Sequence, residues 1–355
     1  MKHSFKVVLF SSFLLLYSCN GSGTEPKSPT VLEPNTPSKT YINPLKTIDQ
    51  KNLYIADPFV YKHNGIYYLT GTSDLPDGMG FAYYESKDLI TWTYKGALYK
   101  KPENHVGTSA FWAPEVKYYK GKFYMTYSCY VPNRDQALTC LAVSETPDGP
   151  FKDLYTPWFD LGYSAIDSNI FVDDDGTPYV YYSKNSTEDA IAQGELYAAK
   201  LKNDLSGIDG YPVFISKASQ DWEKVRWDVN RCNEGPFVFK KNGTYYMTYS
   251  GNDTGYEFYG VGVSTAKSPL GPWEKYDDNP MMTTDLSKNV SSPGHNSIVE
   301  STDGKDLYIV YHRHEDANCK KPNWTRVVCI DKLYFDENGK LKVNGPTSTP
   351  QEVSW

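Results

Sequence analysis

One sequence pattern occurs five times along the chain and limits its fold more than any other feature. Each copy starts with a small or polar residue, continues through an apolar run, turns at a glycine and ends in an aromatic run. The turn glycines are Gly65, Gly121, Gly176, Gly243 and Gly304, which lie 56, 55, 67 and 61 residues apart. In four copies Asn or Asp precedes this glycine, a pair that favours the positive φ angles of a tight hairpin turn. Each copy is therefore predicted to begin with a β-hairpin.

Further strand-like segments follow each hairpin, so that every copy holds three to four strands in about 60 residues. Aromatic residues are 15% of the 355, with 26 Gly and 23 Pro, a composition that disfavours long helices. Five such units predict an all-β fold, a five-bladed β-propeller that forms a single domain. The alternative is a two-sheet sandwich, which would show alternation and turns without a fixed motif at a near-constant interval.

The N-terminal residues resemble a bacterial lipoprotein signal peptide. Lys2, His3 and Lys6 precede an apolar run at residues 7–17, and Cys19 follows a small residue. The run has 11 residues, too few to span a bilayer core, which needs about 20 helical residues. We expect residues 1–18 to be removed, Cys19 to carry lipid, 19–43 to form a flexible tether and 44–355 to form the propeller. This predicts a protein anchored in the bacterial cell envelope, facing the periplasm or the cell surface.

The net charge restricts the classes of binding partner, and the cysteine spacing restricts the roles of the cysteines. The formal net charge is −7, which argues against nucleic-acid binding because neutralising phosphates needs clustered Lys and Arg. Cys129 and Cys140 flank one predicted turn, and Cys319 and Cys329 flank another loop. Each pair could form a disulfide in an oxidising compartment. Neither has metal-site spacing, and we interpret them as structural or buried thiols.

Functional residue types stand where the innermost strands begin. In a propeller the first strand of each blade lines the central channel, so residues at these starts converge at one mouth. They are Asp57, the Trp112-Ala113 pair, Asp167, Glu234 and His295. The alternative is that each carboxylate belongs to an unrelated surface turn. On a shared axis, like charges would raise the pKa of at least one carboxyl group.

Carboxylates in an aromatic pocket suit the hydrolysis of glycosidic bonds. One protonated acid donates to the leaving oxygen, while one carboxylate activates water or attacks the sugar. Placement across a channel predicts a wide separation, and hence an inverting reaction. Composition alone does not say which carboxyl group is the acid and which is the base. The apolar neighbours of Glu234 favour its neutral form, so we predict that it is protonated near neutral pH.

Six motifs form an ordered set from about Pro44 to the C-terminus: Ala56-Asp57-Pro58, Trp112-Ala113-Pro114-Glu115, Ile166-Asp167-Ser168, Glu234-Gly235-Pro236, Gly294-His295-Asn296-Ser297 and Tyr311-His312-Arg313-His314. Together they resemble glycoside hydrolase family 43. The resemblance implies a five-bladed propeller that inverts an arabinosyl, xylosyl or galactosyl centre.

The resemblance also implies roles, position by position. Asp57 is similar to the family's general base, Glu234 to its general acid, and Asp167 to the carboxylate that tunes and orients the acid. For substrate binding, it implies that Trp112 is a wall of the sugar subsite, that Arg326 reaches the terminal sugar, and that His295 is the axial histidine that faces a metal ion or water.

We therefore expect an exo-acting, lipid-anchored glycosidase that removes α-L-arabinofuranosyl units from plant glycans. Within the same family the alternatives are a β-xylosidase and a galactan-active hydrolase. A different class is a surface lipoprotein that binds glycans without catalysis, although a binder needs no acid–base pair. We expect a monomer with no required cofactor, on whose axis a structural calcium ion or a water could lie. Its partner would be a pentose-containing oligosaccharide or polysaccharide, with membrane contact only through the anchor.

Overall fold

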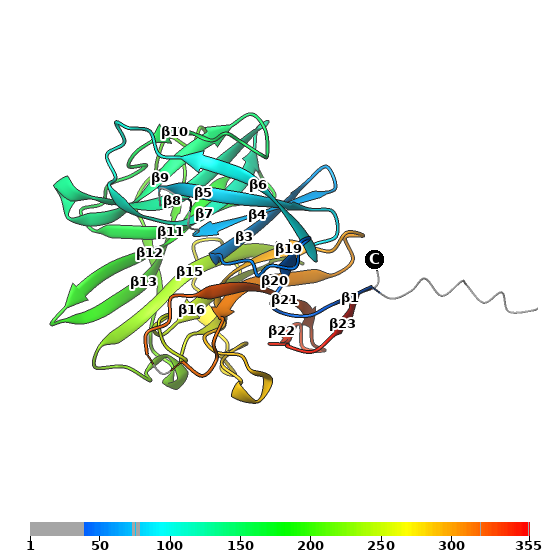
Figure 1. Ribbon diagram of the computed structural model, residues 1–355. Coiled ribbons are helices and arrows are strands. Elements are labelled where there is room, and N and C mark those ends of the chain that lie inside the picture. Colours follow the sequence, from blue (N-terminus) through cyan, green and yellow to red (C-terminus); the bar gives the residue numbers. More distant parts are fainter. Residues whose placement is uncertain (1–38, 73–74, 76–78, 320, 354) are drawn as a thin grey trace, which may run out of the picture. The chain divides into compact units, whose positions relative to one another are not determined.

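Five antiparallel sheets surround one axis in the computed structural model, which describes residues 39–355 apart from 73–74, 76–78, 320 and 354 (Figure 1). The innermost strands contact one another in a closed cycle, from the first sheet to the fifth and back to the first. These strands are β3 (Ala56–His63), β7 (Ser109–Tyr119), β11 (Ser164–Val172), β15 (Asn230–Lys241) and β19 (Gly294–Glu300). The prediction of an all-β, five-bladed propeller is confirmed.

Each blade continues outward through three more strands in chain order. The second strands are β4 (Ile66–Thr72), β8 (Lys122–Val131), β12 (Pro178–Glu188), β16 (Thr244–Gly251) and β20 (Leu307–His314). The third strands are β5 (Gly80–Ser86), β9 (Gln136–Ser144), β13 (Ile191–Lys200), β17 (Gly260–Ala266) and β21 (Arg326–Phe335). The outer strands are β6 (Thr91–Lys100), β10 (Lys152–Tyr155), β14 (Val213–Lys217), β18 (Glu274–Lys275) and β22 (Leu341–Asn344).

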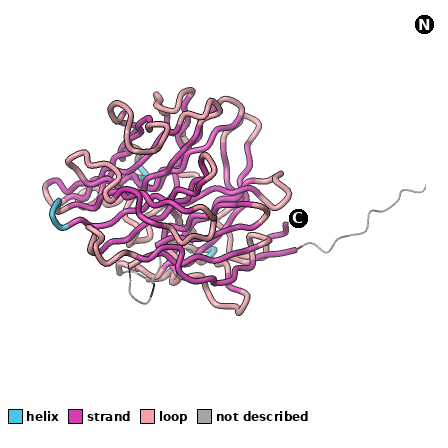
Figure 2. The backbone as a smooth tube through the Cα atoms, turned by 90° about the horizontal axis from the view of Figure 1, so that it is seen from above, coloured by secondary structure: helices cyan, strands magenta, loops and turns pink. Residues whose placement is uncertain are grey.

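Helical structure within the described residues is confined to short turns, as the view from above shows (Figure 2). They are the 3₁₀ turns Pro132–Arg134, Asp221–Glu223 and Leu286–Lys288. No helix in the described part of the chain has the length and apolar character needed to cross a membrane. The predicted signal peptide at 1–18 and Cys19 lie outside the described residues.

The two ends of the described chain pair with each other. Strand β1 (Lys39–Tyr41) runs antiparallel to β23 (Gln351–Val353), and β2 (Lys46–Thr47) lies parallel to β6. The Asn43 side chain adds two bonds to the backbone of Ile330, donating to its carbonyl oxygen at 2.7 Å and accepting from its N–H at 2.9 Å. The folded unit therefore begins at Lys39, and residues 39–43, which we expected in the tether, belong to the fold.

Every inner strand carries a β-bulge near its start. The register with the second strand shifts at the same place in all five blades. One residue of each bulge has a left-handed backbone, namely Asp57 (φ 50°), Ala113 (44°), Asp167 (55°), Gly235 (57°) and His295 (44°). A bulge removes a residue from the regular ladder and redirects its side chain, and bulges are common next to active sites.

The backbone N–H of each bulge residue bonds to a side chain of the preceding blade's second strand. The five pairs are Ala113 with Thr72 Oγ1 (2.8 Å), Asp167 with Ser128 Oγ (3.2 Å), Gly235 with Ser183 Oγ (3.2 Å), His295 with Ser250 Oγ (2.8 Å) and Asp57 with His312 Nδ1 (3.0 Å). We call these five hydrogen bonds the inter-blade ring. They join each blade to the next and close the circle between the fifth and the first.

Aromatic side chains fill the space between the blades. Tyr99 of the first blade and Tyr127 of the second are both buried, with ring centroids 5.0 Å apart. All five cysteines in the described chain are free. Cys129 and Cys140 are buried with their sulfur atoms 3.5 Å apart, so they do face each other, as free thiols.

Removing one hydroxyl of the inter-blade ring tests its contribution to stability. In Ser183→Ala the buried N–H of Gly235 loses its acceptor, so we expect the free energy of unfolding to fall by about 1–3 kcal/mol. Ser264→Ala is the matched control, because Ser264 is equally buried and its hydroxyl has no hydrogen-bond partner among the described residues. Urea unfolding should show a loss in the first variant alone. Equal stabilities would contradict a stabilising role for the ring.

Candidate active site

The predicted carboxylates meet at the mouth of the channel where the inner strands begin. Asp57 comes from the first blade, Asp167 from the third and Glu234 from the fourth. They lie close enough for the charges of Asp57 and Glu234 to raise the pKa of Asp167. Asp167 and His295 are buried, with exposed fractions of 4% and 7%. The bulges thus bring four of the predicted residues into one polar cluster.

Positive and neutral donors surround Asp57. Its Oδ1 lies 3.2 Å from Nδ1 of His295 and 3.9 Å from Nη1 of Arg326, and its Oδ2 accepts a 2.6 Å bond from Thr72. Burial alone would raise the pKa of this carboxyl group, but His295, Arg326, His312 and Thr72 outweigh it and hold the pKa well below the ordinary value. Asp57 is therefore ionised at neutral pH.

The two histidines contribute in different ways. Burial lowers the pKa of both, so both are neutral at neutral pH. His312 accepts the Asp57 N–H through Nδ1, which places its hydrogen on Nε2, beside the Thr254 hydroxyl at 3.3 Å. His295 has Nδ1 next to the carboxylate and can donate there. His312 thus holds the backbone of Asp57, and His295 its side chain.

Glu234 and Asp167 have the opposite electrostatics. Burial and the charge of Asp57 raise the pKa of Glu234 to about 7, against the lowering effect of a 2.8 Å bond that Tyr259 Oη donates to Oε1. Burial, Glu234 and Asp57 raise the pKa of Asp167 well above its ordinary value, although the Gly235 N–H lowers it in part. Protons therefore stay on this pair near neutral pH, which supports the prediction of a protonated Glu234.

The predicted sugar-contacting residues lie at the same mouth. Trp112 precedes the bulge residue Ala113 and is 43% exposed. Arg326 begins β21, and its Nε is buried with no hydrogen-bond partner among the residues that the structure describes. The Arg326 guanidinium also lies 5.7 Å from the ring centroid of Trp324. The exposed Trp324 indole beside the partly unpaired Arg326 guanidinium suits a sugar with several hydroxyl groups.

Sequence reasoning missed three residues that shape the site. Thr72 bonds to the Asp57 carboxylate, His312 to its backbone, and Tyr259 to Glu234. Thr72 had a signal, because in four blades a Thr or Ser stands seven residues after the turn glycine. His312 stands eight residues after Gly304, and its alternation with His314 predicts only that one of the two faces the channel, not a contact with Asp57. Tyr259 lies outside the repeated pattern.

The described residues do not build a protein cage for calcium at His295. His295 Nδ1 faces Asp57, whereas calcium prefers six to eight oxygen ligands. Within the described chain, three ligand atoms of His, Cys, Asp or Glu approach within 4.8 Å only at His105, Cys129 and Cys140. That group offers nitrogen and sulfur, which suit softer metals. The predicted axial calcium is therefore not supported by the ligands present.

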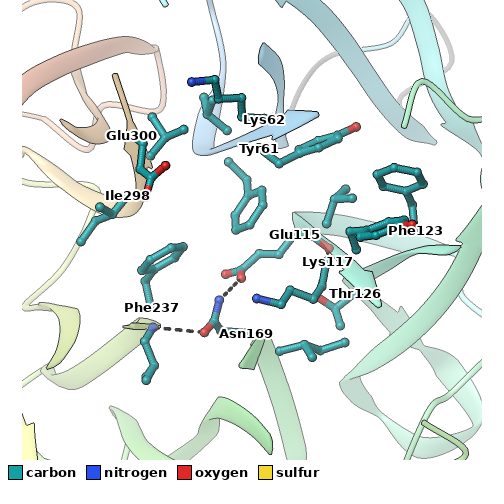
Figure 3. A pocket seen from close by; sticks show the side chains of 17 residues that line it. Tyr61, Lys62, Glu115, Lys117, Phe123, Thr126, Asn169, Phe237, Ile298 and Glu300 are labelled. Carbon is teal, nitrogen blue, oxygen red and sulfur yellow. Dashed lines mark hydrogen bonds between the residues drawn. The ribbon is translucent and has the colours of Figure 1, made fainter. Parts of the chain in front are cut away.

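A cavity of about 420 Å³ lies between the inner strands, beyond their bulges, and side chains of these strands line it (Figure 3). Phe59 and Phe237 line it, together with Glu115, Lys117 and Asn169. Glu115 accepts a 2.6 Å bond from Asn169, and burial raises its pKa to about 8. The cavity thus holds a further buried acid, neutral at pH 7, whose charge would raise the pKa of Asp167.

Comparisons with known proteins agree with this geometry. The chain is 31% identical to the β-D-galactofuranosidase xynD of Aspergillus niger over 81% of this chain and 82% of that protein. It is 28% identical to an extracellular exo-α-(1→5)-L-arabinofuranosidase of Streptomyces avermitilis, over 94% of this chain and 68% of the relative. The crystal structure of a thermostable family-43 glycoside hydrolase matches with a TM-score of 0.81 and 43% identity, covering 88% of this chain and 98% of that one.

The family model described as glycosyl hydrolases family 43 matches residues 48–341, which includes all five inner strands and every residue of the inter-blade ring. Enzymes of this family generally need no cofactor. Since the match extends over most of the sequence, the chain belongs to glycosyl hydrolases family 43 and is an O-glycosyl hydrolase that acts on plant glycans.

Proposed function

We propose that this enzyme is an exo-acting α-L-arabinofuranosidase that works with inversion. The observation that carries the proposal is the contrast within one mouth between an ionised Asp57 and a Glu234 whose pKa is raised to about 7. A base and an acid are thus ready together at neutral pH, which inverting hydrolysis requires. The choice of arabinofuranose is supported by the Streptomyces relative, whose name gives that activity.

In the proposed reaction Glu234 gives its proton to the glycosidic oxygen as the bond to the anomeric carbon breaks. Asp57 takes a proton from a water molecule whose oxygen attacks that carbon from the opposite face. The sugar leaves as a hemiacetal of inverted configuration, with Glu234 ionised and Asp57 protonated. Asp167 is coupled electrostatically to Glu234, and we propose that it tunes and orients the acid before the reaction.

The positions of the two residues in the propeller support inversion. Asp57 lies in the first blade and Glu234 in the fourth, with the fifth blade between them in the cycle. An inverting pair needs room for a water between base and sugar, whereas a retaining pair lies closer. For binding, we propose that Trp112 forms a wall of the sugar subsite and that Arg326 donates to sugar hydroxyl groups. We propose that His295 holds the Asp57 side chain and contacts the sugar next to it.

We also propose that the protein is a monomer exported to the cell envelope. The extracellular Streptomyces relative supports export. The basic start, the apolar run at 7–17 and Cys19 support removal of residues 1–18 and lipid attachment at Cys19. The remaining residues up to Ser38 would connect the lipid to the folded unit.

A substrate panel tests the activity and its stereochemistry together. We expect wild-type enzyme to release arabinose from aryl α-L-arabinofuranoside and from arabino-oligosaccharides, faster than it releases xylose or galactose from matched substrates. Proton NMR of the first product formed should show the inverted anomer. A retained anomer would contradict inversion, and faster release of xylose or galactose would identify a β-xylosidase or a galactan-active hydrolase instead.

Replacing the proposed acid should give a leaving-group signature. In Glu234→Gln we expect kcat on oligosaccharides to fall by roughly 10²–10⁴-fold, because protonation of the leaving oxygen is lost. Aryl glycosides with acidic phenols need little protonation and should lose much less. Asp331→Asn is the matched control, because Asp331 is also buried, with its pKa raised to about 6, but it bonds to Tyr311 and Thr347 rather than to the proposed acid–base residues. Equal losses on both substrate types would argue against the acid role.

Lipid attachment predicts where the protein is found in cells. Wild-type protein should sediment with membranes and incorporate labelled fatty acid, whereas Cys19→Ser should do neither, since the thiol is the proposed attachment point. The Cys319→Ser variant is the control, because Cys319 is a partly exposed free thiol in the folded unit. Labelling that persists in Cys19→Ser would contradict the anchor.

A further inference from the structure

Tyr259 connects the proposed acid to the rest of the site. It lies immediately before β17 and is completely buried. Its hydroxyl donates a 2.8 Å hydrogen bond to Oε1 of Glu234. Oε1 of Glu234 is therefore the hydrogen-bond acceptor. The proton of the neutral carboxyl group is then carried by the other oxygen, Oε2.

The tyrosine ring has little freedom to move. It stacks on the His312 ring at an angle of 4°, with centroids 5.8 Å apart. On another side it lies against Gly294, where an added Cβ would come within 2.3 Å of the ring carbons. His312 also accepts the Asp57 N–H. The stacked pair of Tyr259 and His312 therefore contacts both the proposed acid and the proposed base.

Ser250 is another polar neighbour of Tyr259. It acts to lower the pKa of the Tyr259 hydroxyl, against the larger effect of burial. Its own oxygen accepts the His295 N–H at 2.8 Å. Ser250 thus places the fourth link of the inter-blade ring beside the tyrosine that contacts the proposed acid.

We propose that Tyr259 is a positioning residue for Glu234, which binds Oε1 so that the proton lies on Oε2 and is presented to the glycosidic oxygen. This inference rests on the proposed acid role of Glu234. Tyr259 itself neither touches the sugar nor exchanges a proton with it. Its contribution passes entirely through the glutamate.

The same bond favours the reaction as it proceeds. As Glu234 loses its proton, negative charge develops on the carboxyl group, and a fixed donor at Oε1 interacts more strongly with the charged form than with the neutral one. The gain is therefore larger in the transition state than in the ground state, which is the condition for a rate effect. The bond also lowers the pKa of Glu234, against the effect of burial.

The test is Tyr259→Phe, which keeps the ring and removes the hydroxyl. Without the donor the ionised form of Glu234 loses stabilisation, so we expect the alkaline limb of the kcat/KM profile to move up by about one pH unit. The kcat on oligosaccharides should fall roughly tenfold, and that on activated aryl glycosides much less. KM should change little, because the tyrosine does not contact substrate.

Tyr249→Phe is the matched control. Tyr249 is also fully buried in the fourth blade and donates a 2.9 Å bond to a carboxylate, that of Glu223, which lies outside the proposed acid–base set. It should lower stability without moving the pH profile. A Tyr259→Phe profile that coincides with wild type, or an equal shift in Tyr249→Phe, would overturn the proposal.

A second measurement separates this inference from the proposed function. The pKa of Glu234 can be followed by carbon NMR of labelled, substrate-free enzyme in both variants and in wild type. An upward shift in Tyr259→Phe alone supports the hydrogen bond whatever the substrate proves to be. No shift there would refute it, whereas an inactive wild type would refute only the proposed reaction.

Discussion

The inter-blade ring is the constraint on which the rest of the structure depends. A propeller must hold its blades together around an axis, and here each junction uses a backbone N–H that a bulge has released from the sheet. Three of the five bulge residues are Asp57, Asp167 and His295, so the atoms that join the blades belong to residues that form the site. The left-handed backbone at these positions has a cost of its own, offset by the hydrogen bonds. The bulges that allow the propeller to close therefore also place the chemical groups of the site.

The pKa values of Asp57 and Glu234 shift in opposite directions because the two carboxyl groups have different neighbours, although burial acts on both. Burial acts to raise the pKa of all three carboxyl groups. Around Asp57, the Arg326 guanidinium, His295 and the Thr72 hydroxyl reverse this effect. Glu234 has only the Tyr259 donor and a more distant Arg326, with Asp57 and Asp253 acting in the other direction. The ionisation states are therefore set by how close each carboxyl group lies to Arg326 and to hydrogen-bond donors, rather than by its depth in the pocket.

The sequence predicted the blades and the carboxylates because both depend on local signals at a regular interval. Turn glycines and aromatic runs are determined within a few residues, and the same interval locates the strand starts. The bulges, the role of His312 and the contact of Tyr259 could not be predicted in this way. The Asp57–His312 bond joins residues 255 positions apart, and pairing of residues 39–41 with 351–353 joins the two ends of the fold. A polar segment such as 39–43 looks like a tether until its distant partner strand is known.

The identity of the bulge residue in each blade separates the proposed acid from the other two carboxyl groups. Glu234 precedes the bulge residue of its blade, which is Gly235, whereas Asp57 and Asp167 are bulge residues themselves. A Cβ at position 235 would lie 3.2 Å from the His295 ring, tighter than an ordinary contact. Glycine at this position avoids that contact while its N–H bonds to Ser183. The bulge positions without a functional group, Ala113 and Gly235, are the smallest of the five, and in both blades the functional side chain, Trp112 or Glu234, stands one residue earlier in the chain.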